Sequence, residues 1–145
     1  KFCTQPNWDG TNYGKDFSTD GGAANIMMTE ANGFYKVEVD LQALSYKLTP
    51  ITSIGIIGDA AGGWDKDIVM TYDAASHTWI AKSVTLKDGE IKFRANGAWD
   101  ISWGGTDLKK LTSNNGANIR VNAGTYTIKL KPSYDGNTQA ELTKE

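Results

Sequence analysis

A period-two alternation of side chains in residues 89–105 constrains the fold of this chain more than any other feature. The stretch reads GEIKFRANGAWDISWGG. Apolar and polar residues take turns through its first half, in the order Ile91, Lys92, Phe93, Arg94, Ala95 and Asn96. Because successive side chains of a strand point to opposite faces, the pattern predicts a strand with one buried face and one polar face.

Strand signals recur along the whole chain, and no segment shows sustained helical periodicity. Sixteen glycines against three prolines, with many threonines and aromatic residues, are typical of short strands joined by tight turns. We expect loops at residues 59–67 and 108–117. We expect strands at residues 34–41, 43–48, 53–57, 68–72, 78–86, 91–96, 118–121, 125–131 and 139–143. The spacing predicts an all-β chain folded as an antiparallel β-sandwich.

Composition excludes several classes of partner. The 145 residues carry a formal net charge of −2 without a basic run, which argues against nucleic acid. No apolar run approaches the roughly 20 residues of a membrane-spanning helix. One cysteine and one histidine rule out an internal disulfide and a Cys/His metal cluster, so we expect no metal and no cofactor.

The chain contains an internal similarity between residues 1–50 and 92–145. Lys1-Phe2 matches Lys92-Phe93, and Trp8-Asp9 matches Trp99-Asp100 at the same offset. Glycine, aromatic and strand signals then continue in the same order. The alternative is chance similarity between two β-rich segments.

The similarity predicts a domain organisation. Residues 1–50 would be the second half of a preceding β-sandwich repeat, and residues 51–145 a complete second repeat. A half-repeat exposes strand edges and an open core face, which is unfavourable. We therefore expect the first half of that repeat to have been lost, to be disordered, or to be supplied by another chain.

Three segments together resemble the C-terminal repeats of the SusE/SusF family of surface starch-binding lipoproteins: IGDAAGGWDKDIVMTYD, GEIKFRANGAWDISWGG and AGTYTIKL. The resemblance covers nearly all of residues 51–145 and, more loosely, residues 1–50. It implies tandem β-sandwich modules of the immunoglobulin-like or carbohydrate-binding-module-like kind. It also implies a lipid anchor outside this chain, on the extracellular face of the cell outer membrane. The implied partners are α-glucan and other outer-membrane polysaccharide-uptake proteins.

Aromatic residues are the first candidates for a glycan site. Trp64 lies in a glycine-rich segment and Trp103 precedes two glycines, so we expect both rings to be exposed and to bind ligand. Trp99 fits either a binding platform or a core position. Trp79 lies among apolar strand residues, so we expect it in the core.

Polar residues beside these aromatics are the candidate hydrogen-bonding groups. Arg94 presents a planar fork of donors, and Asn96 offers both a donor and an acceptor. Lys92 shares their face, although solvated strand-face side chains are the alternative for all three. For Asp65 and Asp67 we expect turn capping rather than sugar or calcium binding.

These observations predict non-catalytic binding of a starch-like α-glucan. Indole rings would stack on the apolar faces of glucose while Arg94 and Asn96 bond its hydroxyl rim. In residues 1–50 Cys3 replaces the arginine and Gln5 the asparagine, so we expect no strong site there. The alternatives are a protein-docking module with exposed tryptophan anchors, and a glycoside hydrolase using Glu90 and Asp100.

Overall fold

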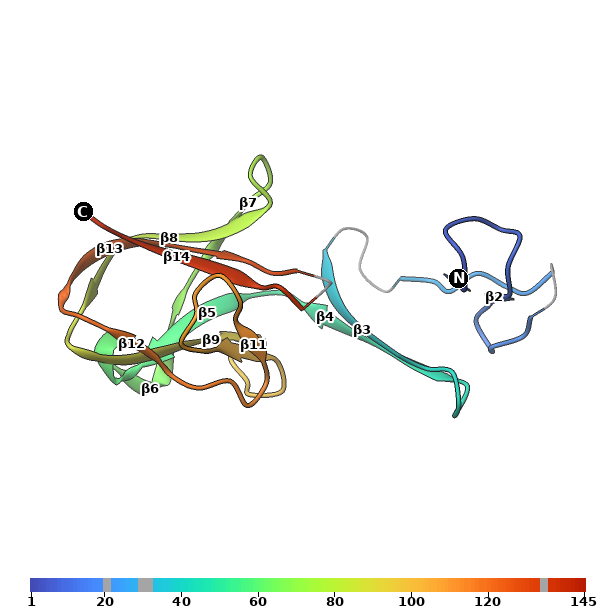
Figure 1. Ribbon diagram of the computed structural model, residues 1–145, viewed down its shortest axis with the longest axis horizontal. Coiled ribbons are helices and arrows are strands. Elements are labelled where there is room, and N and C mark those ends of the chain that lie inside the picture. The colour runs from blue at the N-terminus through green and yellow to red at the C-terminus, as the bar shows by residue number, and fades with distance from the viewer. Residues whose placement is uncertain (20–21, 29–32, 134–135) are drawn as a thin grey trace. The chain divides into compact units, whose positions relative to one another are not determined.

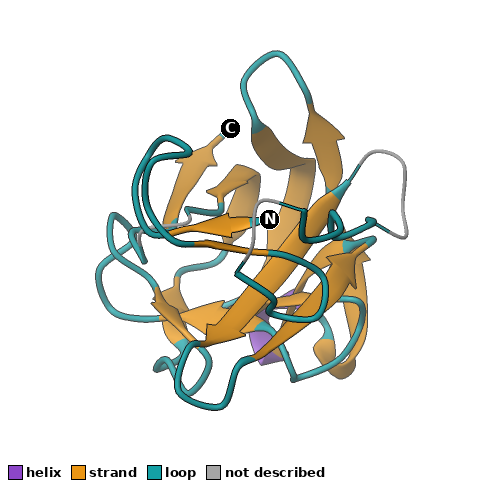
Figure 2. Ribbon diagram, turned by 90° about the vertical axis from the view of Figure 1, so that its right-hand side faces the viewer, coloured by secondary structure: helices purple, strands orange, loops and turns teal. Residues whose placement is uncertain are grey.

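The computed structural model describes residues 1–19, 22–28, 33–133 and 136–145. It divides into two compact units, Lys1–Ile51 and Thr52–Glu145. Strands, with the loops and turns that join them, make up almost all of the described chain (Figure 2). The one helical element in that part is a short 3-10 turn, η1 (Asp59–Ala61).

The first sheet of the second unit is built around the strand that the alternation predicts, β9 (Gly89–Ala95). One side of β9 pairs with β5, and the other side pairs first with β10 and then with β12. β6 and β11 lie outside β5 and β10. The bounds of these partners are β5 (Ile54–Gly58), β6 (Gly63–Val69), β10 (Ser102–Gly104), β11 (Thr112–Ser113) and β12 (Ile119–Val121).

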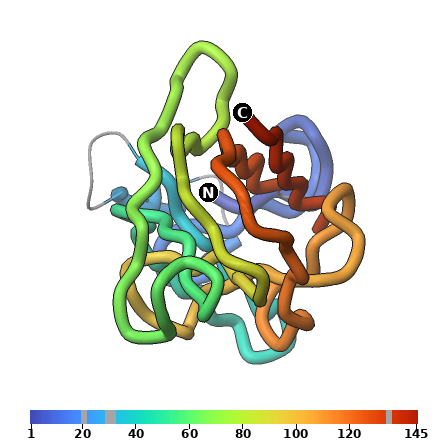
Figure 3. Tube along the Cα trace, turned by 90° about the vertical axis from the view of Figure 1, so that its left-hand side faces the viewer, coloured from blue at the N-terminus to red at the C-terminus, as the bar shows by residue number. Residues whose placement is uncertain are grey.

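The second sheet of this unit has four antiparallel strands in the order β14-β13-β8-β7. Their bounds are β7 (Thr71–Asp73), β8 (Thr78–Leu86), β13 (Gly124–Lys131) and β14 (Gln139–Lys144). β8, β13 and β14 lie side by side in Figure 1, and the trace in Figure 3 follows β8 beside β13.

The core of the second unit is formed by the inner faces of these two sheets. Ile91 and Phe93 of β9 are completely buried, and so are Ile128 and Leu130 of β13. Trp79 is buried as well, as the sequence predicts. Apolar burial on two facing sheets is the arrangement of a β-sandwich, so the predicted all-β class is confirmed.

Trp103 belongs to this core, and the expectation that its ring is exposed is wrong. It lies opposite Phe93 across the β9/β10 pair, while Ser102 lies opposite Arg94. Directly opposed residues share a face of the sheet. Trp103 therefore points inward beside Phe93, and only 6% of it is exposed.

Two segments expected to be loops contain strand. Residues 59–67 form η1 and most of β6, and β11 lies within residues 108–117. The β5/β6 pair is irregular, because Ile56 pairs with Ile68 but Gly58 pairs with Gly63. More residues of β6 than of β5 lie between these two pairs, so β6 bulges there. The period-two rule does not hold through such a bulge, which is why the sequence pattern missed the strand.

The first unit contains two short antiparallel pairs. β1 (Phe2–Cys3) pairs with β2 (Asn12–Tyr13), and β3 (Phe34–Asp40) pairs with β4 (Ser45–Ile51). Rings of Phe2, Phe17 and Tyr46 lie 5.5–6.1 Å apart and form its small aromatic cluster. Cys3 is exposed and has no disulfide.

The buried position of Trp103 gives a stability prediction. Replacing it with alanine should lower the free energy of unfolding by about 3–5 kcal/mol, the usual cost of removing a large core side chain. Trp103→Phe should cost less because it leaves a smaller cavity. Urea denaturation measures both values, and an unchanged midpoint for Trp103→Ala would contradict the assignment of this ring to the core.

The β3/β4 and β13/β14 hairpins should differ in local stability. Val37 and Val39 of β3 are 48% and 41% exposed, whereas Ile128 and Leu130 of β13 are fully buried. Two-stranded ribbons without a covered face are only marginally stable. We expect amide hydrogens of β3 to exchange at least about tenfold faster than those of β13. Equal protection of the two hairpins in hydrogen-exchange mass spectrometry would contradict this expectation.

Candidate functional site

The candidate site lies on the outer face of the first sheet, around Arg94. Lys92 and Arg94 alternate with the buried residues of β9 and therefore share this face. Arg94 is flanked by small residues, Gly55 on β5 and Ser102 on β10. Small neighbours leave room for long side chains to lie across the sheet.

Arg94 is held by an ion pair with Asp67 of β6. Its Nε donates to both carboxylate oxygens of Asp67, at 2.9 and 3.2 Å. Arg94 is only 8% exposed, so the pair is nearly withdrawn from water. A Cβ atom on Gly55 would lie 2.7 Å from the Cβ of Asp67, so glycine at this position lets Asp67 approach. We expected Asp67 to cap a turn, and it instead bonds this arginine.

Trp99 lies above the two cations of β9. The Cζ atom of Arg94 is 4.8 Å from the centre of the Trp99 ring, and the Nζ atom of Lys92 is 5.8 Å from it. Both distances are typical of cation–π contacts. Lys92 is itself fixed, because its Nζ donates to the carbonyl of Gly116 at 2.7 Å.

Trp64 and Trp99 form an exposed aromatic pair, called here the indole pair. Their ring centres are 6.2 Å apart and their planes are tilted by 37°. Trp64 comes from the bulged strand β6, and Trp99 from the connection between β9 and β10. They are 39% and 47% exposed, so a ligand can reach both rings.

The side chain of Asn96 hydrogen-bonds backbone groups of its own chain. Its φ of 56° ends β9 in the left-handed region, which asparagine tolerates better than most residues. Its Oδ1 accepts hydrogen bonds from the backbone N–H groups of Thr52 and Ser53, at 2.8 and 3.4 Å, and from the Thr52 hydroxyl. The acceptor of this amide therefore fastens the start of the second unit to the end of β9.

The structure brings together four of the six predicted site residues: Trp64, Lys92, Arg94 and Trp99. Asn96 lies at the end of the same strand, and Trp103 lies on the opposite, buried face. The sequence reasoning missed the part played by Asp67. The signal available was an acidic residue three positions after Trp64, but nothing in the pattern revealed that it lies beside Arg94.

The two carboxylates considered for hydrolysis, Glu90 and Asp100, lie on different segments, β9 and the connection between β9 and β10. Oε2 of Glu90 accepts a hydrogen bond from the side chain of Asn118 at 2.7 Å. Asp100 is exposed in the loop after Trp99. The contacts of Glu90 connect neighbouring segments of the first sheet, which is a structural role.

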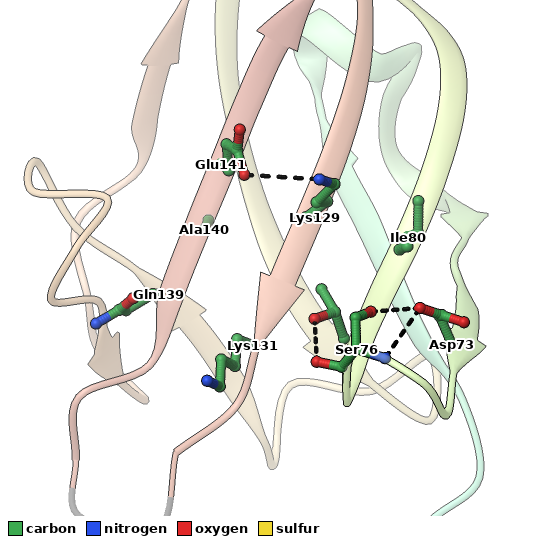
Figure 4. A pocket seen from close by; sticks show the side chains of 9 residues that line it. Asp73, Ser76, Ile80, Lys129, Lys131, Gln139, Ala140 and Glu141 are labelled. Atoms are coloured by element: carbon green, nitrogen blue, oxygen red, sulfur yellow. Dashed lines mark hydrogen bonds and ion pairs between the residues drawn. The ribbon is translucent and has the colours of Figure 1, made fainter.

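A separate hollow of about 410 Å³ lies on the second sheet, and Figure 4 shows its lining. Lys129 and Glu141 are paired neighbours on β13 and β14 in this lining, with Nζ 3.8 Å from Oε2. A hydrogen bond from the Ser76 hydroxyl lowers the pKa of the Asp73 carboxyl below its usual value. None of the described lining residues is aromatic, so this hollow offers no stacking surface for a sugar.

Within residues 1–19, 22–28, 33–133 and 136–145, no helix is long and apolar enough to cross a membrane.

The comparisons with known proteins identify the family. No curated protein matches the chain. A family model described as SusF/SusE starch-specific carbohydrate-binding modules matches residues 53–140. The match covers more than half of the chain and includes every strand that contributes to the site. Modules of this class are non-catalytic, which agrees with the prediction that the chain is not an enzyme. The chain therefore belongs to the SusF/SusE family of starch-specific carbohydrate-binding modules.

Proposed function

We propose that the chain binds starch-like α-glucan on the indole pair. The observation that carries the proposal is the placement of two accessible rings 6.2 Å apart on one sheet face, in a module whose family is described as starch-specific. Glucose has apolar C–H faces, and indole rings offer large rigid surfaces for them. The pair therefore supplies most of the contact area.

The expected affinity is low. Apolar burial contributes about 25 cal/mol per Å², and two rings cover only a few sugar units. Loss of translational and rotational freedom offsets much of that gain. Micromolar-to-millimolar dissociation constants are the expected range, with tighter attachment where several modules act on one polymer.

The tilt between the rings favours a curved ligand. An α-1,4-linked glucan coils, so successive sugar faces turn relative to one another. Rings inclined by 37° match such a turn better than they match the flat ribbon of a β-1,4-linked chain. The linkage preference of the site therefore follows from the angle between two side chains.

Hydrogen bonds to the sugar rim have a smaller part in the proposal than the stacking. Nε of Arg94, Nζ of Lys92 and Oδ1 of Asn96 already bond groups of the protein. A ligand can bond only the remaining donors of these groups without breaking existing bonds, and each net gain would be about 1 kcal/mol at best. The indole pair, rather than Arg94 and Asn96, is thus assigned the leading role.

We also propose a cell-surface setting. Membership of the SusF/SusE family supports lipid-anchored display on the outer membrane, beside other polysaccharide-uptake proteins.

The register of β1 and β2 supports residues 1–50 as the second half of another repeat. Phe2 pairs with Tyr13 as Phe93 pairs with Trp103, and Cys3 pairs with Asn12 as Arg94 pairs with Ser102.

Removal of either ring should weaken glycan binding. We expect Trp99→Ala and Trp64→Ala each to reduce affinity for soluble starch about thirtyfold, or about 2 kcal/mol, because each deletes a central aromatic contact. Affinity electrophoresis in gels containing starch measures the effect.

Trp8→Ala is the matched control, because Trp8 is exposed but lies in the first unit. It should be retarded like the unaltered chain. Retention of Trp99→Ala and Trp64→Ala on starch would contradict the proposal. Failure of the unaltered chain to bind any polysaccharide would favour the protein-docking alternative.

Linkage selectivity provides an independent prediction. The chain should bind malto-oligosaccharides at least about tenfold more tightly than cello-oligosaccharides of equal length, because only the coiled chain can contact both tilted rings. Isothermal titration with the two series measures the ratio. Equal affinities would show that the ring angle does not select the linkage.

A further inference from the structure

We infer that Asp67 and Arg94 are positioning residues, whose ion pair holds the Trp99 ring in its binding orientation. This inference rests on the proposed function, since it concerns the same indole pair. It assigns a role to Asp67, and it changes the role expected for Arg94 from a ligand donor to a support beneath the platform.

The first step of the argument is the ion pair itself. Arg94 is 8% exposed and the Asp67 carboxylate accepts twice from its Nε. A guanidinium withdrawn from water needs a counter-charge, and Asp67 is the acidic group that bonds it. The carboxylate therefore restricts where the plane of the guanidinium can lie.

The second step concerns the support of Trp99. The ring projects from a tight turn in which Asn96 and Gly97 both have positive φ. Backbone bonds from Ala98 N–H to the Ala95 carbonyl and from Ala95 N–H to the Ile101 carbonyl close this turn. These bonds fix the backbone but not the side-chain torsions of Trp99. The groups beneath the ring, Arg94 and Lys92, are what can fix its orientation.

The third step separates this role from direct hydrogen bonding. If Arg94 only donated to the glucan, neutralising Asp67 would change the affinity but leave the geometry of the ligand-free indole pair intact. If the ion pair holds Trp99, the same change lets the arginine shift, and the ring loses its fixed place even without ligand. The two roles therefore predict different ring geometries in the ligand-free chain after one substitution.

The test is Asp67→Asn in the full chain, titrated with maltoheptaose. We expect affinity to fall about tenfold, in line with loss of a desolvated cation–π contact and of preorganisation. The second measurement is far-UV circular dichroism, because two indoles 6.2 Å apart couple their electronic transitions and give a paired band. That band should weaken in Asp67→Asn without ligand, and Trp64→Phe should abolish it.

Glu90→Gln is the matched control. Glu90 is another carboxylate of the first sheet, but it bonds Asn118 rather than a residue beneath the rings. Its neutralisation should leave both the paired band and the affinity unchanged. Asp67→Glu, which restores the negative charge, should recover part of both.

Arg94→Lys provides a second route if Asp67→Asn does not fold. Lysine keeps the charge pair with Asp67 but lacks the planar group beneath Trp99. It should weaken the paired band and lower the affinity for maltoheptaose.

A folded Asp67→Asn that binds maltoheptaose as tightly as the unaltered chain, with its paired band intact, would overturn the inference. The same result from Arg94→Lys would overturn it by the second route. The proposed function would survive either result as long as Trp99→Ala still lost binding. Failure of the unaltered chain to bind would instead refute the proposed function, while the paired band would still report on the ion pair.

Discussion

The outer face of the first sheet is organised around Arg94, whose guanidinium is almost completely withdrawn from water. Arg94 occupies a central strand whose other face fills the core with Ile91 and Phe93, so its side chain has to lie across the sheet. A charge in that position costs several kcal/mol unless a counter-ion meets it. The Asp67 carboxylate supplies this counter-charge. A side chain of the bulged strand β6 thereby contacts the centre of the sheet.

Irregular backbone segments place the two exposed indole rings. Trp99 follows two residues with positive φ, and Trp64 lies where β6 departs from its register with β5. Regular alternation alone would not bring these two rings from different segments to one place. The sandwich provides the rigid base, and its two irregularities provide the proposed binding surface, which is the usual division between scaffold and site.

The sequence predicted the features that depend on local periodicity. It did not predict the features that depend on pairing between segments distant in the chain. Alternation placed Phe93 inside and Arg94 on the opposite face, and apolar context placed Trp79 in the core. The orientation of Trp103 depends on its register with β9, because a shift of one residue reverses the faces. The Asp67 contact depends on a bulge whose residues follow no period. The glycines after Trp103, from which we expected an exposed ring, instead allow close backbone packing, since a Cβ on Gly104 would lie 2.3 Å from the Ala117 carbonyl oxygen.

Preorganisation explains how so small a surface can serve as the proposed binding site. If both indoles were mobile, the entropy lost on ordering them would offset part of the free energy that stacking provides. Trp99 seated on Arg94 and Lys92 is already ordered, so more of the stacking energy remains for affinity. The buried ion pair adds little net stability to a fold of this kind. Its position beneath the ring is therefore better explained by the proposed fixed angle of the indole pair than by the stability of the sandwich.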